Sequence, residues 1–256
     1  MLLVAVAVTT GAEASAGTAP PAPAVGVPRV VAVRPHDARA YVQGLLFHDG
    51  RLYESNGQYG RSQLVEIDPT NGRVLRSVRL PSDEFAEGLA RVGDRLIQLT
   101  WREGVARIWR LPGLEPAGEW RYEGEGWGLT FDGERLIQSD GSAVLTFRSP
   151  EDFRILGRVT VRRGGSAVPY LNELEWVEGA IYANVWMSDE ILRIDPASGE
   201  VTAAWDASGL LDPAARELGA EVLNGIAWDP GRRVFHVTGK YWPSRFEVEL
   251  APPPAR

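Results

Sequence analysis

The chain contains 256 residues, of which 44% are hydrophobic and 24% charged, and its formal net charge is −7 at pH 7. This length and composition predict one sizeable folded domain and argue against a disordered chain. The absence of Cys excludes disulfides, thiolate metal sites and a cysteine nucleophile. The acidic balance, without any basic run, argues against a nucleic-acid partner.

The N-terminal residues resemble an export signal more than part of a fold. An apolar run over residues 2–8 precedes Ala14-Ser15-Ala16, a small-residue pattern typical of signal cleavage. The run is too short to span a bilayer, and a disordered tail is the alternative. We expect a signal peptide at 1–16, a Pro/Ala-rich linker at 17–27 and an exported protein, periplasmic or secreted, with no membrane attachment once processed.

Five internal repeats organise the rest of the chain. Each joins a short apolar run, a turn containing Gly and a second apolar run, followed by further alternating segments. The repeats begin at Gln43, Glu87, Trp127, Asn172 and Asn224, which are 44, 40, 45 and 52 residues apart. A period near forty residues with four strands per unit is typical of a propeller blade. The sequence therefore predicts an all-β fold, a five-bladed β-propeller over residues 28–250.

The two ends of the repeat array complete this prediction. The longest interval contains Asp212-Pro213 before a run of helix formers, which indicates one short inserted helix with an N-cap residue. The fifth repeat supplies only three strands before the chain ends, whereas residues 28–34 form a strand with no neighbour in sequence. We predict that this N-terminal strand completes the last blade, because closing the ring removes an exposed sheet edge.

The repeat also predicts where the functional side chains gather. The first strand of a blade lines the central channel and the second runs antiparallel beside it. The residue that opens strand one and the residue that closes strand two therefore lie at the same end of the ring. The openers are Gln43, Glu87, Trp127, Asn172 and Asn224, and the closers lie near Ser55, Trp101, Asp140, Trp186 and Lys240.

The predicted mouth combines carboxylates, an ammonium group, amides and indoles, which is typical of a small-ligand site. Lys240 is the one Lys among 27 basic residues, and a buried Lys can lose its proton whereas Arg cannot. Taken singly, a polar residue at a strand end is more often a turn cap, and a Trp is as often a packing residue. The convergence of these residues is what predicts a site.

Ten ordered motifs spanning residues 41–242 resemble the plant and bacterial type of glutaminyl-peptide cyclotransferase. They include Tyr41-Val42-Gln43-Gly44-Leu45, Glu87-Gly88-Leu89, Gln98-Leu99-Thr100-Trp101, Gly126-Trp127-Gly128-Leu129, Ser139-Asp140-Gly141, Leu171-Asn172-Glu173-Leu174, Ala183-Asn184-Val185-Trp186, Leu223-Asn224-Gly225-Ile226 and Thr238-Gly239-Lys240. The resemblance implies a five-bladed propeller that converts the N-terminal Gln of peptides or proteins to pyroglutamate and releases ammonia. It implies a pocket formed by Gln43, Glu87, Trp101, Trp127, Asn172, Trp186 and Lys240, with Tyr41 where Phe is frequent.

We therefore name Glu87, Lys240 and Asn172 as candidate catalytic residues. We expect Glu87 to carry a proton from the substrate amine to the departing ammonia, and Lys240 to stabilise the oxyanion or act as the acid. The candidate substrate-binding residues are Tyr41, Gln43, Trp101, Trp127, Asp140, Trp186 and Asn224. We expect neither a metal nor a cofactor, and a monomer.

Two other classes of function stay open at this point. A propeller lactonase or esterase would hold a metal in the channel, and Glu87, Asp140, Asn172 and Asn224 offer the oxygen ligands that Ca²⁺ prefers. A non-catalytic propeller would use the same mouth to bind a peptide end, because fold alone does not decide function.

Overall fold

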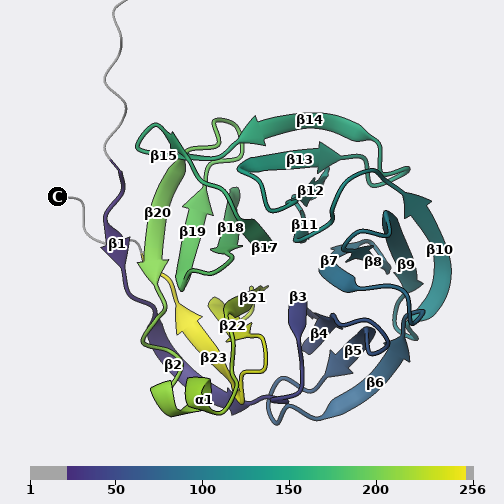
Figure 1. The fold of residues 1–256 in the computed structure, drawn as a ribbon, viewed down its shortest axis with the longest axis horizontal. Coiled ribbons are helices and arrows are strands. Elements are labelled where there is room, and N and C mark those ends of the chain that lie inside the picture. The colour runs from purple at the N-terminus through teal and green to yellow at the C-terminus, as the bar shows by residue number, and fades with distance from the viewer. Residues whose placement is uncertain (1–21, 252–256) are drawn as a thin grey trace, which may run out of the picture.

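The computed structural model describes residues 22–251, which form five four-stranded antiparallel blades around a central axis (Figure 1). The predicted five-bladed propeller is confirmed. The predicted signal peptide, 1–16, and the first part of the predicted linker lie outside the described residues. The strands are rich in Val, Leu and Ile alternating with polar residues, as expected for sheets packed face to face.

The first three blades each use four consecutive strands, with the innermost strand first in sequence. Blade 1 contains β3 (Val42–His48), β4 (Arg51–Asn56), β5 (Gln63–Ile67) and β6 (Val74–Arg79). Blade 2 contains β7 (Ala86–Val92), β8 (Arg95–Thr100), β9 (Val105–Arg110) and β10 (Glu115–Arg121). Blade 3 contains β11 (Leu129–Phe131), β12 (Leu136–Gln138), β13 (Val144–Arg148) and β14 (Ile155–Thr160).

The last two blades recruit strands from the N-terminal segment. Blade 4 contains β17 (Leu171–Val177), β18 (Ala180–Val185), β19 (Glu190–Ile194) and β20 (Val201–Asp206), with β1 (Val25–Gly26) parallel to β20. Blade 5 contains β21 (Leu223–Asp229), β22 (Val234–Gly239), β23 (Ser244–Glu249) and, outermost, β2 (Arg29–Pro35). The antiparallel pairing of β2 with β23 confirms that the N-terminal strand closes the ring. The β1 pairing places part of the segment expected as a linker on the surface of blade 4.

Two small elements occupy the connections beside blade 4. The hairpin of β15 (Arg162–Arg163) and β16 (Ser166–Ala167) precedes β17, and α1 (Pro213–Glu217) precedes β21. The carboxylate of Asp212 caps α1 by accepting the backbone N–H of Ala214 at 2.9 Å, which confirms the predicted short helix. No helix among residues 22–251 is long and apolar enough to cross a membrane.

The apolar core is divided among the five interfaces between neighbouring blades, with one buried cluster at each. The interface of blades 1 and 5, where the ring closes, contains Leu45, Leu52, Val65, Ile67 and Ala227. Burying these side chains against the next blade stabilises the ring by about 1.5–3 kcal/mol for each large residue. Each blade therefore depends on its neighbours, which fixes the positions of all five inner strands.

Glycine at the second position of four repeats allows the inner strands to meet near the axis. A Cβ atom on Gly44 would lie 2.7 Å from the backbone nitrogen of Leu89 in the next blade, and one on Gly128 would overlap the Asn172 carbonyl oxygen. In blade 4 the corresponding residue is Glu173, whose carboxylate accepts the backbone N–H groups of Leu45 at 3.1 Å and Ile226 at 3.0 Å. The side chain of Glu173 thus links blades 4, 1 and 5 across the channel.

We expect Gly128→Ala to lower the free energy of unfolding by about 3 kcal/mol, because the added methyl group meets backbone atoms that cannot move aside. Gly209→Ala is the matched control, since a Cβ at Gly209 meets no atom within 4 Å. Thermal and urea unfolding of both variants measure the difference. Equal stability of the two variants would contradict the close approach of β11 and β17.

Candidate active site

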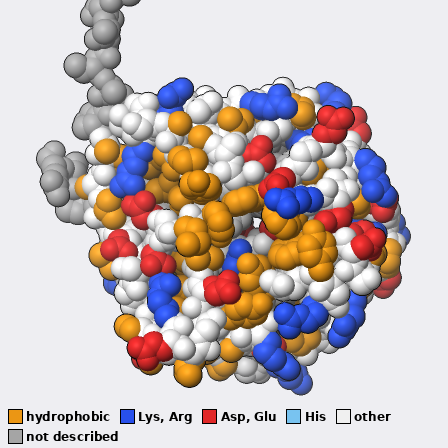
Figure 2. Space-filling view, viewed as in Figure 1, with side chains coloured by type: hydrophobic (Ala, Val, Ile, Leu, Met, Phe, Trp, Pro, Cys, Tyr) orange, Lys and Arg blue, Asp and Glu red, His pale blue; other side chains and the backbone are white. Residues whose placement is uncertain are grey.

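Four of the five residues that open the inner strands line a cavity of about 410 Å³ at one end of the channel. The cavity is lined by Tyr41, Gln43, Phe85, Glu87, Trp101, Arg102, Glu125, Trp127, Asn172, Trp186 and Lys240. The structure thus brings eight of the ten predicted site residues together. Viewed down the ring, hydrophobic side chains gather around a hollow at its centre, with charged side chains between them (Figure 2).

A β-bulge marks the opening residue in four of the five inner strands. Pairing with the second strand shifts register between Val42 and Gly44, Ala86 and Leu89, Leu171 and Leu174, and Leu223 and Ile226. These intervals contain Gln43, Glu87, Asn172 and Asn224. A bulge turns a side chain away from the regular alternation of the strand. The bulges therefore explain how polar side chains leave strands that are otherwise apolar.

A chain of hydrogen bonds holds the Glu87 carboxylate. Gln43 donates from Nε2 to Oε1 of Glu87 at 2.7 Å. Asn224 in turn donates from Nδ2 to Oε1 of Gln43 at 3.2 Å and to the carbonyl oxygen of Val42 at 3.0 Å. This chain fixes one carboxylate oxygen of Glu87 and leaves Oε2 for a ligand. All three side chains are almost completely buried.

Burial changes the proton affinities of both ionisable groups at the base of the cavity. It raises the pKa of Glu87 well above the usual carboxyl value, and the carboxylates of Glu103 and Glu125 add to this, while Lys240 opposes it. Burial lowers the pKa of Lys240, which Glu87 and Glu221 oppose. The two pKa values are thereby brought closer together, so that proton transfer near neutral pH costs less.

The other cavity residues provide aromatic walls and a free hydrogen-bond acceptor. Lys240 Nζ lies 4.6 Å from the centre of the Tyr41 ring. Trp127 and Trp186 meet edge to face with ring centres 5.8 Å apart. The Oδ1 atom of Asn172 is buried without a hydrogen-bond partner in the described part of the chain. A buried acceptor without a donor is costly, so Asn172 is suited to receive an N–H group from a ligand.

Two predicted substrate-binding residues lie outside the cavity lining. The exposed carboxylate of Asp140 accepts hydrogen bonds from the backbone N–H of Ser142 at 3.0 Å and from its hydroxyl at 2.6 Å. Its short side chain therefore caps its own turn. Asn224 lies behind Gln43 and supports it through the hydrogen bond described above. For both residues, the repeat correctly places the backbone at the mouth, but local hydrogen bonds set where the side chain points.

Three lining residues, Phe85, Arg102 and Glu125, were not predicted from the sequence. Phe85 and Glu125 stand two residues before the openers Glu87 and Trp127, as Tyr41 does before Gln43. Side chains two positions apart in an extended segment point to the same side. In these three repeats, the position two residues before the opener is therefore the sequence signal, whereas Tyr170 and Val222, at the same position before Asn172 and Asn224, do not line the cavity. Arg102 directly follows the closer Trp101 and carries no such signal.

The four oxygen-bearing residues considered for calcium are not gathered into one group. Glu87 and Asn172 line the cavity. Asp140 instead caps its own turn, and Asn224 donates a hydrogen bond to Gln43. Among residues 22–251, no group of three or more His, Asp and Glu side chains is placed to hold a metal ion. The four residues therefore do not form the calcium site considered above.

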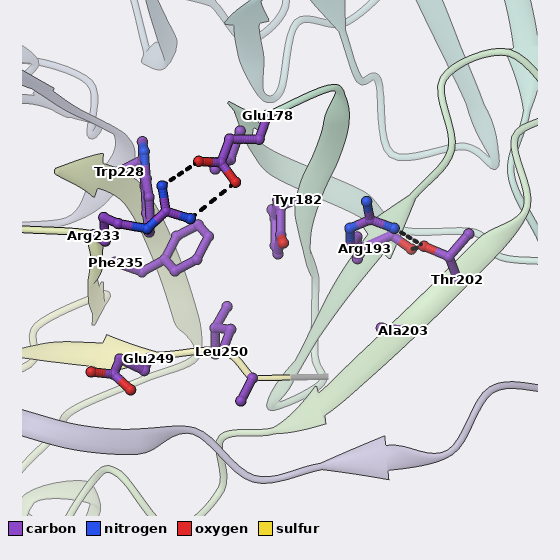
Figure 3. Close-up of a pocket in the computed structure, with 12 residues that line it drawn as sticks. Glu178, Tyr182, Arg193, Thr202, Ala203, Trp228, Arg233, Phe235, Glu249 and Leu250 are labelled. Carbon is purple, nitrogen blue, oxygen red and sulfur yellow. Dashed lines mark hydrogen bonds and ion pairs between the residues drawn. The ribbon is translucent and has the colours of Figure 1, made fainter. Parts of the chain in front are cut away.

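A second cavity, of about 620 Å³, lies between blades 4 and 5 (Figure 3). Its wall contains Tyr182, Trp228 and Phe235. Of the charged groups drawn there, Glu178 accepts two hydrogen bonds from Arg233, at 2.6 and 3.2 Å, Glu249 accepts one from Arg29 at 3.0 Å, and Arg193 donates one to the hydroxyl of Thr202 at 2.8 Å. Both carboxylates in this lining are held by Arg side chains, so we assign the cavity no chemistry.

Comparison with known proteins agrees with this geometry. The family model described as glutamine cyclotransferase matches residues 1–250. The chain belongs to the glutamine cyclotransferase family. It is 38% identical over 228 residues to glutaminyl-peptide cyclotransferase from Arabidopsis thaliana, covering 86% of this chain and 70% of that protein. The crystal structure of Myxococcus xanthus glutaminyl cyclase matches with a TM-score of 0.82 and 41% identity, covering 89% of this chain and 98% of that one.

For this glutamine cyclotransferase, we expect Lys240→Met to raise the pKa of Glu87 further, because the substitution removes the cation that opposes the effect of burial. A ¹³C NMR titration of labelled Glu side chains measures the shift, and the Glu87→Gln variant assigns the resonance. Arg79→Met, which removes an exposed cation outside the cavity lining, is the control. A lower Glu87 pKa in Lys240→Met would contradict the proximity of the two groups.

Proposed function

We propose that this protein is a glutaminyl-peptide cyclotransferase, which cyclises the N-terminal Gln of peptides or proteins to pyroglutamate and releases ammonia. The observation that carries the proposal is a buried carboxylate, Glu87, sharing one aromatic-walled cavity with the buried ammonium group of Lys240. The family membership and the named relatives support the same activity.

The reaction joins the substrate α-nitrogen to the δ-carbon of its own side chain and breaks the bond from that carbon to the amide nitrogen. The attacking amine must lose a proton, and the departing nitrogen must gain one to leave as ammonia. Glu87 is placed to accept the first proton on Oε2 and to deliver it to the leaving group, because Gln43 occupies only Oε1. Its raised pKa suits a group that both accepts and returns a proton.

Charge develops on the amide oxygen when the ring closes. Lys240 is the buried cation of the cavity lining, whereas Arg102 is exposed, and Lys240 stabilises the oxyanion by charge and by donating a hydrogen bond. The free Oδ1 of Asn172 accepts an N–H of the substrate and orients the amine or the amide. Each of these groups is buried before substrate arrives, so little reorganisation is needed during the reaction.

The indoles hold the Gln side chain in a folded conformation that brings amine and amide carbon together. Trp101, Trp127 and Trp186 provide flat apolar walls around a cavity large enough for one amino-acid side chain. Orienting two groups of one molecule for attack contributes several kcal/mol, on the order of the entropy otherwise lost in bringing them together. The walls also exclude water, which would compete as a nucleophile.

We also propose that the enzyme is exported, acts as a monomer and needs no metal. The apolar run and Ala14-Ser15-Ala16 support export. The presence of Glu87 and Lys240, an acid and a base, in one cavity supports chemistry that does not depend on a metal.

Incubation with a Gln-initiated dipeptide tests the proposed activity directly. We expect ammonia release with a matching loss of one ammonia in the peptide mass, unchanged by a chelator. The same peptide with an acetylated α-amine is the control, since a blocked amine cannot attack. Binding without ammonia release would identify a non-catalytic peptide receptor, whereas release from the acetylated peptide would identify a hydrolase.

We expect Glu87→Gln to lower kcat by more than about a hundredfold, because an amide cannot carry the proton. Its oxygen still accepts the hydrogen bond from Gln43, so the melting temperature should stay close to wild type. Asp140→Asn is the matched control and should keep nearly full activity, because Asp140 lies outside the cavity lining. Wild-type turnover by a folded Glu87→Gln variant would reject the assigned role.

A further inference from the structure

The carboxylate of Glu125 lies between two cavity indoles that belong to different blades. Glu125 is part of the loop from β10 to β11, and its Oε2 accepts the Nε1–H of Trp101 at 2.8 Å and that of Trp127 at 3.0 Å. Trp101 follows β8 of blade 2, whereas Trp127 precedes β11 of blade 3. A single oxygen atom therefore connects the walls contributed by the two blades.

Arg102 fixes Glu125 from the outer side. Its Nε donates to Oε1 of Glu125 at 2.9 Å, and its guanidinium carbon lies 3.7 Å from the centre of the Trp101 ring. Partial burial acts to raise the pKa of Glu125, but hydrogen bonds from Trp127, Arg102 and Trp101 outweigh it and hold the pKa below the usual carboxyl value. Glu125 thus stays ionised while Glu87 is poised for proton transfer.

These contacts determine how the two indoles are turned. An indole has a single N–H donor, so a fixed acceptor for that donor sets the rotation of the ring about its side-chain bonds. Each of the two indoles also meets another ring of the cavity edge to face: Phe85 and Trp101 have centres 5.7 Å apart, and Trp127 and Trp186 5.8 Å. Glu125 joins these two aromatic pairs into one continuous wall.

We propose that Glu125 is a positioning residue that orients Trp101 and Trp127 around the folded Gln side chain of the substrate. The identity of the substrate in this statement rests on the proposed function, whereas the orientation of the indoles rests on the hydrogen bonds alone. Glu125 itself acts through the indoles and takes no part in proton transfer.

The negative charge of Glu125 also affects the pKa of Glu87. The groups that act on the charge of its carboxylate are Lys240 and the hydrogen bond from Gln43, which favour ionisation, and the carboxylates of Glu103 and Glu125, which oppose it. Replacing Glu125 with Gln removes one negative charge and leaves the others in place. The pKa of Glu87 should therefore fall, and the acid limb of kcat/KM should move to lower pH.

Three variants test the proposal: Glu125→Ala, Glu125→Gln and the control Glu123→Gln, an exposed Glu two residues away that lies outside the cavity lining. We expect Glu125→Ala to lower kcat/KM for a Gln dipeptide about tenfold, because two partly buried indole donors lose the acceptor that orients them. Glu125→Gln keeps an acceptor and should recover part of that loss while shifting the acid limb to lower pH. Glu123→Gln should match wild type in both respects.

The indole N–H resonances supply a readout that does not depend on turnover. In ¹H–¹⁵N spectra, assigned with Trp101→Phe and Trp127→Phe, both indole signals should move in Glu125→Ala and stay in place in Glu123→Gln. Unmoved signals, or a wild-type kcat/KM in Glu125→Ala, would overturn the proposal. If wild-type protein shows no cyclisation but the signals move, the proposed function fails and the positioning of the two indoles stands.

Discussion

The close approach of five inner strands around the channel axis is the constraint on which the site depends. Gly44 and Gly128 permit backbones of neighbouring blades to touch, and Glu173 fills the equivalent place in blade 4 with a carboxylate bonded to two other blades. Because the strands start at the same level, residues 40 to 52 positions apart in sequence become neighbours at one mouth. The five apolar clusters between blades then hold this arrangement rigidly.

The close approach of the inner strands also creates the conditions for proton transfer at the site. Side chains at the base of so narrow a mouth lose their contact with water. Burial disfavours the charged forms of both Glu87 and Lys240, which raises the pKa of Glu87 and lowers that of Lys240. The bulges at Gln43 and Glu87 turn polar side chains into this dry space, and Asn224 supports them from behind. A strand arrangement that serves stability therefore also supplies a group able to exchange protons near neutral pH.

The repeat in the sequence was sufficient to predict the number of blades, the closing role of residues 28–34 and the mouth at which the functional residues meet. It predicted backbone positions, and eight of the ten named residues line the cavity for that reason. It did not predict the directions of the side chains. The carboxylate of Asp140 is held by hydrogen bonds within its own turn, and the side chain of Asn224 by a hydrogen bond to Gln43. Glu125 was not predicted, because it lies two residues before the start of its repeat. Tyr41 occupies the equivalent position before the first repeat.

Burial and a raised pKa do not by themselves identify the proton carrier, as a comparison of two carboxylates shows. Glu87 and Glu173 are both buried, and burial raises the pKa of each well above the usual value. In Glu173, each oxygen already accepts a backbone N–H, from Leu45 and from Ile226, and the side chain does not line the cavity. In Glu87, one oxygen is held by Gln43 and the carboxylate lines the cavity. A group that must accept and return a proton needs both a fixed position and an open oxygen, and of these two carboxylates Glu87 has both.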